Sequence, residues 1–227
     1  TGLTEWTSHN VIQINGRANE IKLPAKYQIL TESWNRVVAV PYIVYMPEKD
    51  RVLMLVSCDY PHQAMTLQSD DHGASWSLPK YVHTDTMGKP DTGMGVGLTY
   101  LGNGKVLMVS GTEKGLWVWF SYDYGETWND RAVFPPASNG LIFNFGWDPP
   151  LIDKDPLTGK VSRVIAGGYI LNSTLYESAA TPGYSIGGIR LSKDGARTWD
   201  DVINVPEWLG ANEGAFTRAK NGDIVAA

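Results

Sequence analysis

The sequence predicts an all-β protein built from repeated four-stranded units, and three observations support this. One eight-residue pattern, with Ser first, Asp third and Trp last, occurs at residues 69–76, 121–128 and 192–199. No stretch keeps apolar residues at a sustained helical spacing, which argues against helices. The 24 glycines, 13 prolines and 9 tryptophans among 227 residues suit many turns and wide apolar platforms.

The repeated octapeptide reads as a hairpin turn that caps itself. Glycine adopts a positive φ at little cost, and an Asp side chain accepts hydrogen bonds from the backbone of its own turn. The closing Trp offers a large apolar body to the next element. In the third copy, SKDGARTW, Gly195 falls one place early and Ala196 takes the glycine position, so we expect a distorted turn.

The segment 1–40 precedes the first regular unit. VIQI at 11–14 and YQIL at 27–30 are candidate strands, and Asn15-Gly16 is a turn signal after the first of them. In a closed ring of such sheets, an N-terminal strand often completes the last sheet, and residues 11–14 are a candidate for this role.

From Pro41 onward, each unit has the same order of strands, with the octapeptide between the third strand and the fourth. This anatomy predicts the blades of a β-propeller over 41–227. Expected strands lie at 41–46, 52–57, 63–69 and 80–84 in the first unit, 95–101, 105–111, 116–121 and 131–134 in the second, 148–153, 162–170, 184–192 and 201–206 in the third, and 213–219 and 224–227 in the fourth.

The octapeptide pattern Ser-x-Asp-x-Gly-x-Thr/Ser-Trp resembles the Asp-box, or BNR repeat, of sialidases (neuraminidases) and related propellers. The resemblance implies a sialidase-type β-propeller of which about three and a half blades are present. Because an open blade edge is a liability, we expect these blades to be part of a six-bladed domain. In the family, these boxes lie on the blade periphery, so the boxes themselves are not expected to take part in catalysis.

The same resemblance implies catalytic residues. Counting back from the aligned turns places Glu213 at the start of an inner strand, where sialidases have a Glu that activates a Tyr nucleophile. That Tyr would lie beyond Ala227. The family's acid/base Asp lies in the loop that is SCDYPHQAM here, so Asp59 or His62 could donate a proton to the leaving oxygen.

Substrate-binding candidates come from the other strand starts. Sialidases hold the substrate carboxylate with three arginines, but the first position is Ala39 here, and Arg36 is nearby out of register. Asp91 in KPDTGMG is a further candidate. Trp147 and Asp148 in FGWDPP could stack on a sugar face and hydrogen-bond its hydroxyls.

Composition narrows the classes of partner. A net charge of −5 with no basic run argues against nucleic acid. We expect no cofactor and no metal, because the sequence has no phosphate-binding glycine loop, no HExxH and one cysteine, Cys58, in an apolar run that favours a buried free thiol. No apolar run is long enough to span a membrane. Because glycans are usually trimmed outside the cytoplasm, we expect an extracellular or periplasmic location.

Three functions remain open from the sequence. The first is an exo-glycosidase that removes a terminal residue, such as sialic acid, from a glycan. The missing arginine at Ala39 motivates the second, a polysaccharide lyase or non-sialic glycosidase with His62 as acid/base. The third is a propeller that binds glycan without catalysis, since a fold does not fix a function.

Overall fold

A computed structural model describes residues 5–13, 20–112, 115–138, 143–145, 147–171, 185–210 and 214–226, with backbone alone over 5–28. The chain divides into two compact units, Thr1–Val38 and Ala39–Ala227. The described residues form strands and turns without helices, which confirms the predicted all-β class.

The first unit is a β-hairpin. Strand β1 (Glu5–Gln13) pairs antiparallel with β2 (Glu20–Gln28), in a register that runs from Glu5 opposite Gln28 to Gln13 opposite Glu20. The predicted turn signal Asn15-Gly16 lies outside the described residues. The expectation that residues 11–14 complete a last blade stays a prediction.

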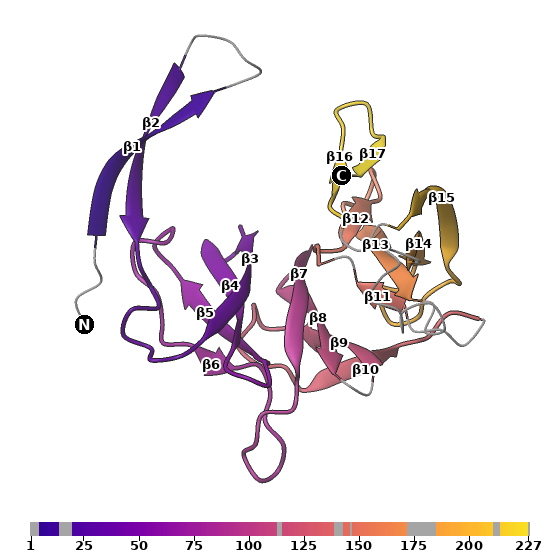
Figure 1. Cartoon of the computed structure of the whole chain (residues 1–227), viewed down its shortest axis with the longest axis horizontal. Coiled ribbons are helices and arrows are strands. Elements are labelled where there is room, and N and C mark those ends of the chain that lie inside the picture. Colours follow the sequence, from indigo (N-terminus) through magenta and orange to yellow (C-terminus); the bar gives the residue numbers. More distant parts are fainter. Residues whose placement is uncertain are drawn as a thin grey trace. The chain divides into compact units, whose positions relative to one another are not determined.

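The second unit begins with two four-stranded sheets, each arranged in sequence order (Figure 1). In the first sheet, the first two strands are two or three residues longer than predicted, the third has the predicted bounds, and the fourth is shorter than predicted. The strands of these sheets are β3 (Val38–Met46), β4 (Arg51–Cys58), β5 (Gln63–Ser69) and β6 (Lys80–Tyr81), then β7 (Met94–Gly102), β8 (Lys105–Thr112), β9 (Gly115–Ser121) and β10 (Asp130–Phe134).

The third sheet differs from the prediction in two ways: the expected strand 148–153 forms only from residue 151, and a short strand that was not predicted precedes it. Both short strands, β11 and β12, pair with the long strand β13. The break falls at 146–150, where Trp147 has a φ of +65° and two prolines lack the amide that a ladder requires. The strands are β11 (Phe143–Phe145), β12 (Leu151–Lys154), β13 (Val161–Leu171), β14 (Ser185–Ser192) and β15 (Ile203–Leu209).

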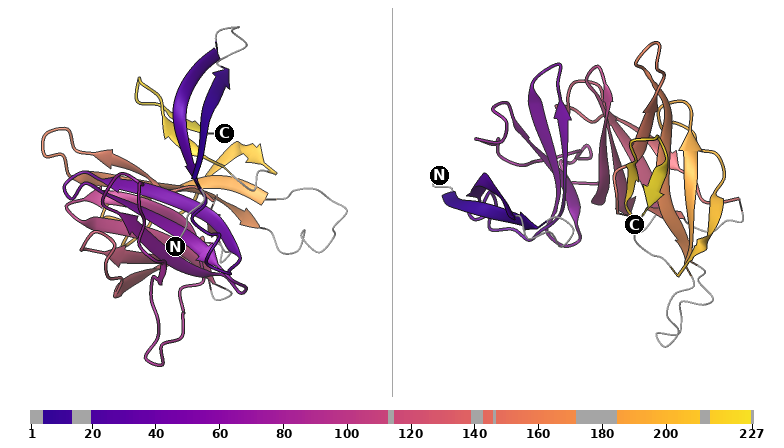
Figure 2. Two further views of the ribbon diagram at one scale, coloured as in Figure 1. Left: turned by 90° about the vertical axis from the view of Figure 1, so that its left-hand side faces the viewer. Right: turned by 90° about the horizontal axis from the view of Figure 1, so that it is seen from above.

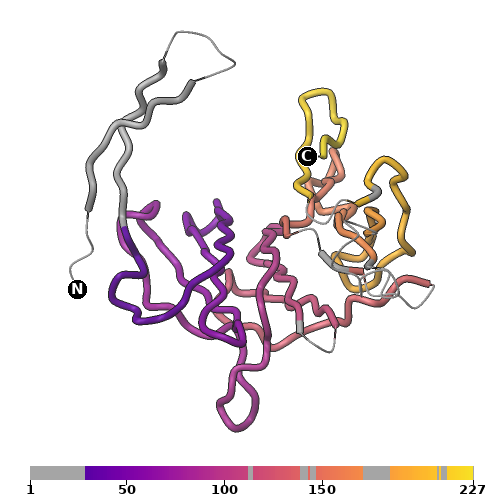
Figure 3. Tube along the Cα trace, in the orientation of Figure 1, coloured from indigo at the N-terminus to yellow at the C-terminus, as the bar shows by residue number. Residues whose placement is uncertain are grey.

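A fourth sheet starts with the hairpin of β16 (Phe216–Arg218) and β17 (Ile224–Ala226). Within the second unit, the first strand of each sheet lies on the inner side of the array and the later strands point outward (Figure 1). The chain trace passes from one sheet to the next in sequence order (Figure 3), and two further views show the same succession (Figure 2). This is the arrangement of propeller blades.

Apolar side chains fill the spaces between successive sheets. Leu55 and Leu98, with Trp119, belong to a core between the first and second sheets. Phe120 and Val164, with Phe143, belong to a core between the second and third. Side chains alternate across each strand, so Trp119 and Phe120 face different neighbours. Cys58 is fully buried, as predicted, and as the single cysteine of the sequence it forms no internal disulfide.

The three octapeptides share one hydrogen-bond pattern. In the second copy, the Ser121 hydroxyl donates to Asp123 Oδ1 at 2.8 Å and accepts from the Gly125 amide at 2.9 Å. The Asp123 carboxylate accepts from the Thr127 amide at 2.9 Å, and the Trp128 indole donates to the Gly125 carbonyl at 3.1 Å. The first copy repeats these bonds.

The third octapeptide keeps most of this pattern despite its displaced glycine. Ala196 takes the glycine place with a φ of +74°, and its amide donates to the Ser192 hydroxyl at 2.8 Å. The difference lies at the tryptophan, because the buried Trp199 Nε1 has no hydrogen-bond partner within the described part of the chain. The expected distortion is therefore confined to the loss of one indole hydrogen bond.

The sixth residue of the octapeptide connects neighbouring sheets. Glu126 accepts a hydrogen bond from Arg51, a buried arginine at the start of β4 that also forms a bidentate pair with Asp70 at 2.6 and 3.0 Å. In the third copy the sixth residue is Arg197, which pairs with Asp130 of the second sheet. The turns therefore hold adjacent sheets together as well as closing their own hairpins.

Candidate functional site

One end of the sheets carries the loop between β4 and β5, residues 59–62, beside the start of β7. The Ala64 amide donates to the Gly93 carbonyl at 2.8 Å. The Gln63 side-chain oxygen accepts from the Gly93 amide at 3.1 Å. These bonds hold the loop next to the start of the inner strand β7. The loop carries the two predicted acid/base candidates, and its position is the one expected for a loop of a propeller blade.

Asp59 and His62 lie on this loop in different environments. Asp59 has a φ of +66°, which Asp tolerates better than most residues, and it is partly buried. The His62 ring is partly buried and packs edge-on against exposed Tyr60, with ring centroids 5.8 Å apart. His62 Nδ1 is buried and has no hydrogen-bond partner among the described residues. A buried polar atom without a hydrogen-bond partner is uncommon in proteins, so the His62 ring is a candidate functional group.

Asp91, predicted to bind substrate, is engaged by protein side chains. Its Oδ1 lies 2.6 Å from His83 Nδ1, and its Oδ2 lies 3.8 Å from an Arg131 guanidinium nitrogen. His83 and Arg131 were not predicted as site residues. His83 is the fourth residue of the predicted strand 80–84, but nothing in the sequence shows that the loop folds back to bring Asp91 to it.

Trp147 and Asp148 lie where the inner strands meet. The Tyr42 hydroxyl of β3 donates to the Trp147 carbonyl at 2.8 Å. Asp148 Oδ2 accepts from the Phe216 amide of β16 at 2.8 Å. The Thr99 hydroxyl of β7 donates to the Pro150 carbonyl at 3.0 Å. The broken inner strand of the third sheet is therefore joined to all three other sheets.

This junction leaves one carboxylate oxygen of Asp148 available. Oδ2 is used by Phe216, and Oδ1 has no hydrogen bond to a described residue. The Trp147 side chain is partly buried and packs against the core between the second and third sheets. An indole held beside a carboxylate oxygen can stack on a sugar ring and accept a hydroxyl hydrogen bond.

The remaining predicted site residues are not placed relative to this junction. Glu213 lies outside the described residues. Arg36 is exposed and belongs to the first unit. Ala39 is the second residue of β3, so the position of the family's first arginine carries a methyl group. The roles of Glu213 and Arg36 stay predictions.

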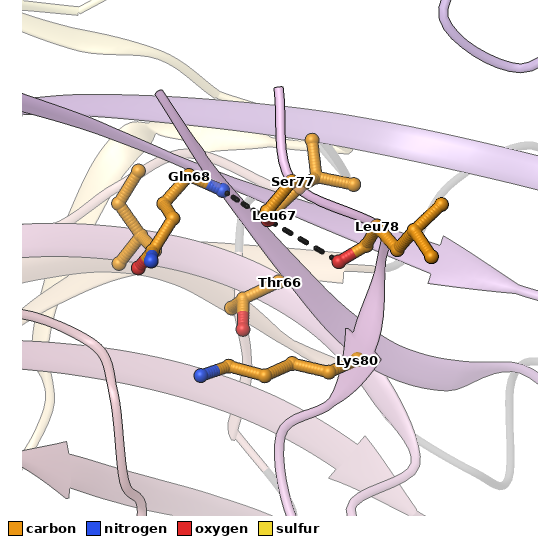
Figure 4. Close-up of a pocket in the computed structure, with 7 residues that line it drawn as sticks. Thr66, Leu67, Gln68, Ser77, Leu78 and Lys80 are labelled. Atoms are coloured by element: carbon orange, nitrogen blue, oxygen red, sulfur yellow. Dashed lines mark hydrogen bonds between the residues drawn. The ribbon is translucent and has the colours of Figure 1, made fainter. Parts of the chain in front are cut away.

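A cavity of about 100 Å³ lies away from this end of the sheets, near the first octapeptide (Figure 4). It is lined by Leu53, Thr66, Leu67, Gln68, Ser77, Leu78 and Lys80. The Gln68 amide donates to the Ser77 hydroxyl at 3.0 Å, and Thr66 Oγ1 and Gln68 Oε1 have no partner. Because residues 66–68 lie toward the end of β5, the cavity is separate from loop 59–62, which precedes that strand.

Over the described part of the chain, no three His, Cys, Asp or Glu side chains gather as metal ligands would. A search of the same residues for a long apolar helix capable of crossing a membrane found none.

Comparison with solved structures identifies the architecture. The Hadza microbial sialidase Hz136 superposes with a TM-score of 0.59 and 14% identity, over 79% of this chain and 39% of that one. The sialidase NanB gives a TM-score of 0.53 and 15% identity, over 99% of this chain and 38% of that one. The chain has the sialidase-type β-propeller fold. A GH43 β-1,3-galactosidase also matches this propeller, with a TM-score of 0.51 and 13% identity, over 89% of this chain and 42% of the other.

Sequence comparison relates the propeller to enzymes with a different named substrate. A xyloglucanase from Paenibacillus sp is 26% identical over 204 residues, 83% of this chain. The xyloglucanase Xgh74A of Acetivibrio thermocellus is 30% identical over 165 residues, 71% of this chain. The matched part spans 18% of the length of each of these relatives. No family model matches the chain.

Proposed function

We propose that this propeller is part of a glycoside hydrolase that acts on a neutral polysaccharide. One observation carries the proposal: the first two residues of each inner strand, β3, β7, β12 and β16, are uncharged. A site that holds a sugar carboxylate needs fixed cations, because guanidinium groups match a carboxylate in charge and geometry. The xyloglucanase relatives agree with a neutral substrate.

The residues at the sheet ends have distinct parts in this proposal. Trp147 stacks on a sugar ring, and Asp148 Oδ1 accepts a hydroxyl hydrogen bond. His62 is the proton donor: its imidazolium form gives one ring proton to the leaving oxygen and becomes the neutral imidazole. Asp59 is the alternative proton donor on the same loop. Glu213 is the base that accepts the proton of the nucleophile.

The sialidase hypothesis is the second candidate. It is favoured by the fold shared with Hz136 and NanB and by the sequence register, which predicts Glu213 at the start of an inner strand. It requires carboxylate-binding arginines, for which Arg36 is the candidate within this sequence.

The test is to assay the full-length protein that contains this propeller on xyloglucan and on a fluorogenic sialoside. We expect hydrolysis of xyloglucan, lowered at least 100-fold by His62→Ala if His62 is the acid, because general acid catalysis contributes about 10²–10⁴-fold. Asp59→Asn and Glu213→Ala are the parallel variants. Turnover of the sialoside alone would overturn the neutral-substrate proposal, and binding of xyloglucan without turnover would indicate a non-catalytic propeller.

A further inference from the structure

A second group of polar side chains gathers at the junction of the first two sheets, outside the residues assigned above. His83 follows β6, Asp91 precedes β7, and Arg131 is the second residue of β10. The single Asp91 carboxylate contacts both other side chains: Oδ1 lies 2.6 Å from His83 Nδ1, and Oδ2 faces Arg131 at 3.8 Å. We call these three residues the junction cluster.

The hydrogen bond to Asp91 fixes the protonation pattern of the neutral His83 ring. An ionised carboxylate only accepts hydrogen bonds, so His83 Nδ1 must donate its proton. Nε2 then carries the lone pair and is an acceptor. Nε2 has no hydrogen-bond partner among the described residues, and 28% of the side chain is exposed. The ring is held 5.0 Å from the Trp119 ring, which is almost fully buried and limits its movement.

Arg131 is held in place by the same surroundings. Its guanidinium lies 4.6 Å from the centre of the Trp117 ring and 4.9 Å from that of Trp119. Stacking on aromatic rings leaves the edge of a guanidinium free to donate hydrogen bonds. With 43% of its side chain exposed and one distant carboxylate partner, Arg131 keeps donors available to a ligand. The junction cluster thus offers a fixed acceptor beside a fixed donor.

We infer that the junction cluster is a second glycan subsite, which binds hydroxyl groups of a polysaccharide beyond the inner strands. A sugar hydroxyl both donates and accepts, so one or two neighbouring hydroxyls satisfy His83 Nε2 and Arg131 together. The cluster lies at the same end of the sheets as loop 59–62, since the Val82 amide donates to the Ala64 carbonyl at 3.0 Å, close to Gln63. This inference rests on the proposed function, because it assumes a glycan ligand.

The test uses histidine side-chain ¹⁵N NMR on the whole polypeptide, titrated with a xyloglucan oligosaccharide. We expect the His83 Nε2 resonance to shift with ligand, while His72 stays unchanged. His72 is a matched control, because it is exposed, contacts a carboxylate (Asp50, at 3.3 Å) and lies in the first octapeptide. His83→Gln should weaken binding about fivefold, as expected for one net hydrogen bond, and His72→Gln should not.

The outcomes separate the two proposals. Shifts at His62 and the Trp147 indole without a shift at His83 would overturn the junction subsite and leave the proposed function standing. A shift at His83 alone would support the subsite and count against the assigned site. An oligosaccharide at millimolar concentration that shifts none of these signals would overturn both. If His83→Gln proves unstable, Arg131→Lys supplies the second variant, and unchanged affinity there would also contradict the subsite.

Discussion

Replacing Gly125 with alanine tests whether the octapeptide and the neighbouring sheet fit as closely as the structure indicates. Gly125 is buried and has a φ of +84°. An added Cβ would lie 2.5 Å from Leu53 Cδ2 and 2.9 Å from its Cδ1. Leu53 is 1% exposed and belongs to the core between the first and second sheets, so it has little room to move.

The expected cost has two parts. A left-handed conformation costs a residue other than glycine about 1–2 kcal/mol, and the reduced freedom of the unfolded chain returns about 0.4–1 kcal/mol. Forcing extra volume into a packed core costs about 1–3 kcal/mol. Together we expect the free energy of unfolding to fall by about 2–4 kcal/mol. For a chain of this size, that lowers Tm by about 4–16 °C.

The assay is urea unfolding followed by tryptophan fluorescence, with Gly102→Ala as the control. Gly102 has a similar φ, +95°, but an added Cβ there meets no atom within 4 Å. It therefore carries the backbone cost alone, about 0.5–1 kcal/mol. Equal losses of stability in both variants would refute the overlap with Leu53. In a double-mutant cycle, Gly125→Ala and Leu53→Val should together cost less than the sum of the two.

Two further predictions follow from the structure. The hydrogen bond from the Ser75 hydroxyl lowers the pKa of Asp71 to about 2, and that from Arg197 lowers the pKa of Asp130 to about 2. Because both values lie below the unfolded-state pKa of about 3.9, these carboxylates stabilise the fold above about pH 5 and lose this effect as the pH falls toward 2. The stability difference between wild type and Asp71→Asn should thus shrink between pH 5 and pH 2 in urea unfolding, and a difference independent of pH would contradict this. In a second experiment, Gly167→Ala should displace the hairpin of β16 and β17, because the added Cβ would lie 1.5 Å from the Phe216 ring. Faster hydrogen exchange at the Phe216 amide, which is bonded to Asp148, would show it; Gly111→Ala, with its nearest contact at 3.5 Å, is the control and should leave that amide unchanged.

The sheets of the second unit could be predicted because local signals set them. Strand β5 occupies the predicted 63–69, since an apolar run ends at an octapeptide that closes by its own hydrogen bonds. The break between β11 and β12 was missed. Strand β11 was not expected because it is set by its pairing with the long strand β13, which lies further along the sequence.

The candidate site was less predictable than the fold. The position of loop 59–62 could be predicted from the blade pattern. A loop that joins two consecutive antiparallel strands must lie at the end of the sheet where the first strand finishes and the second begins. The bond between His83 and Asp91 depends on how residues 84–90 fold back, and the hydrogen bonds of Trp147 and Asp148 depend on three separate sheets. Such contacts are set by tertiary packing, which strand periodicity does not describe.

The opposite charges at the sixth position of the second and third octapeptides constrain the order in which these blades can be joined. Glu126 meets Arg51, whereas Arg197 meets Asp130. In a chimera with the third octapeptide in the second position, Arg197 would face Arg51, which is 4% exposed, and two cations would share a site shielded from water. Blades of nearly identical outline are therefore not interchangeable, and gene duplication within such a propeller would require compensating changes on the adjoining blade.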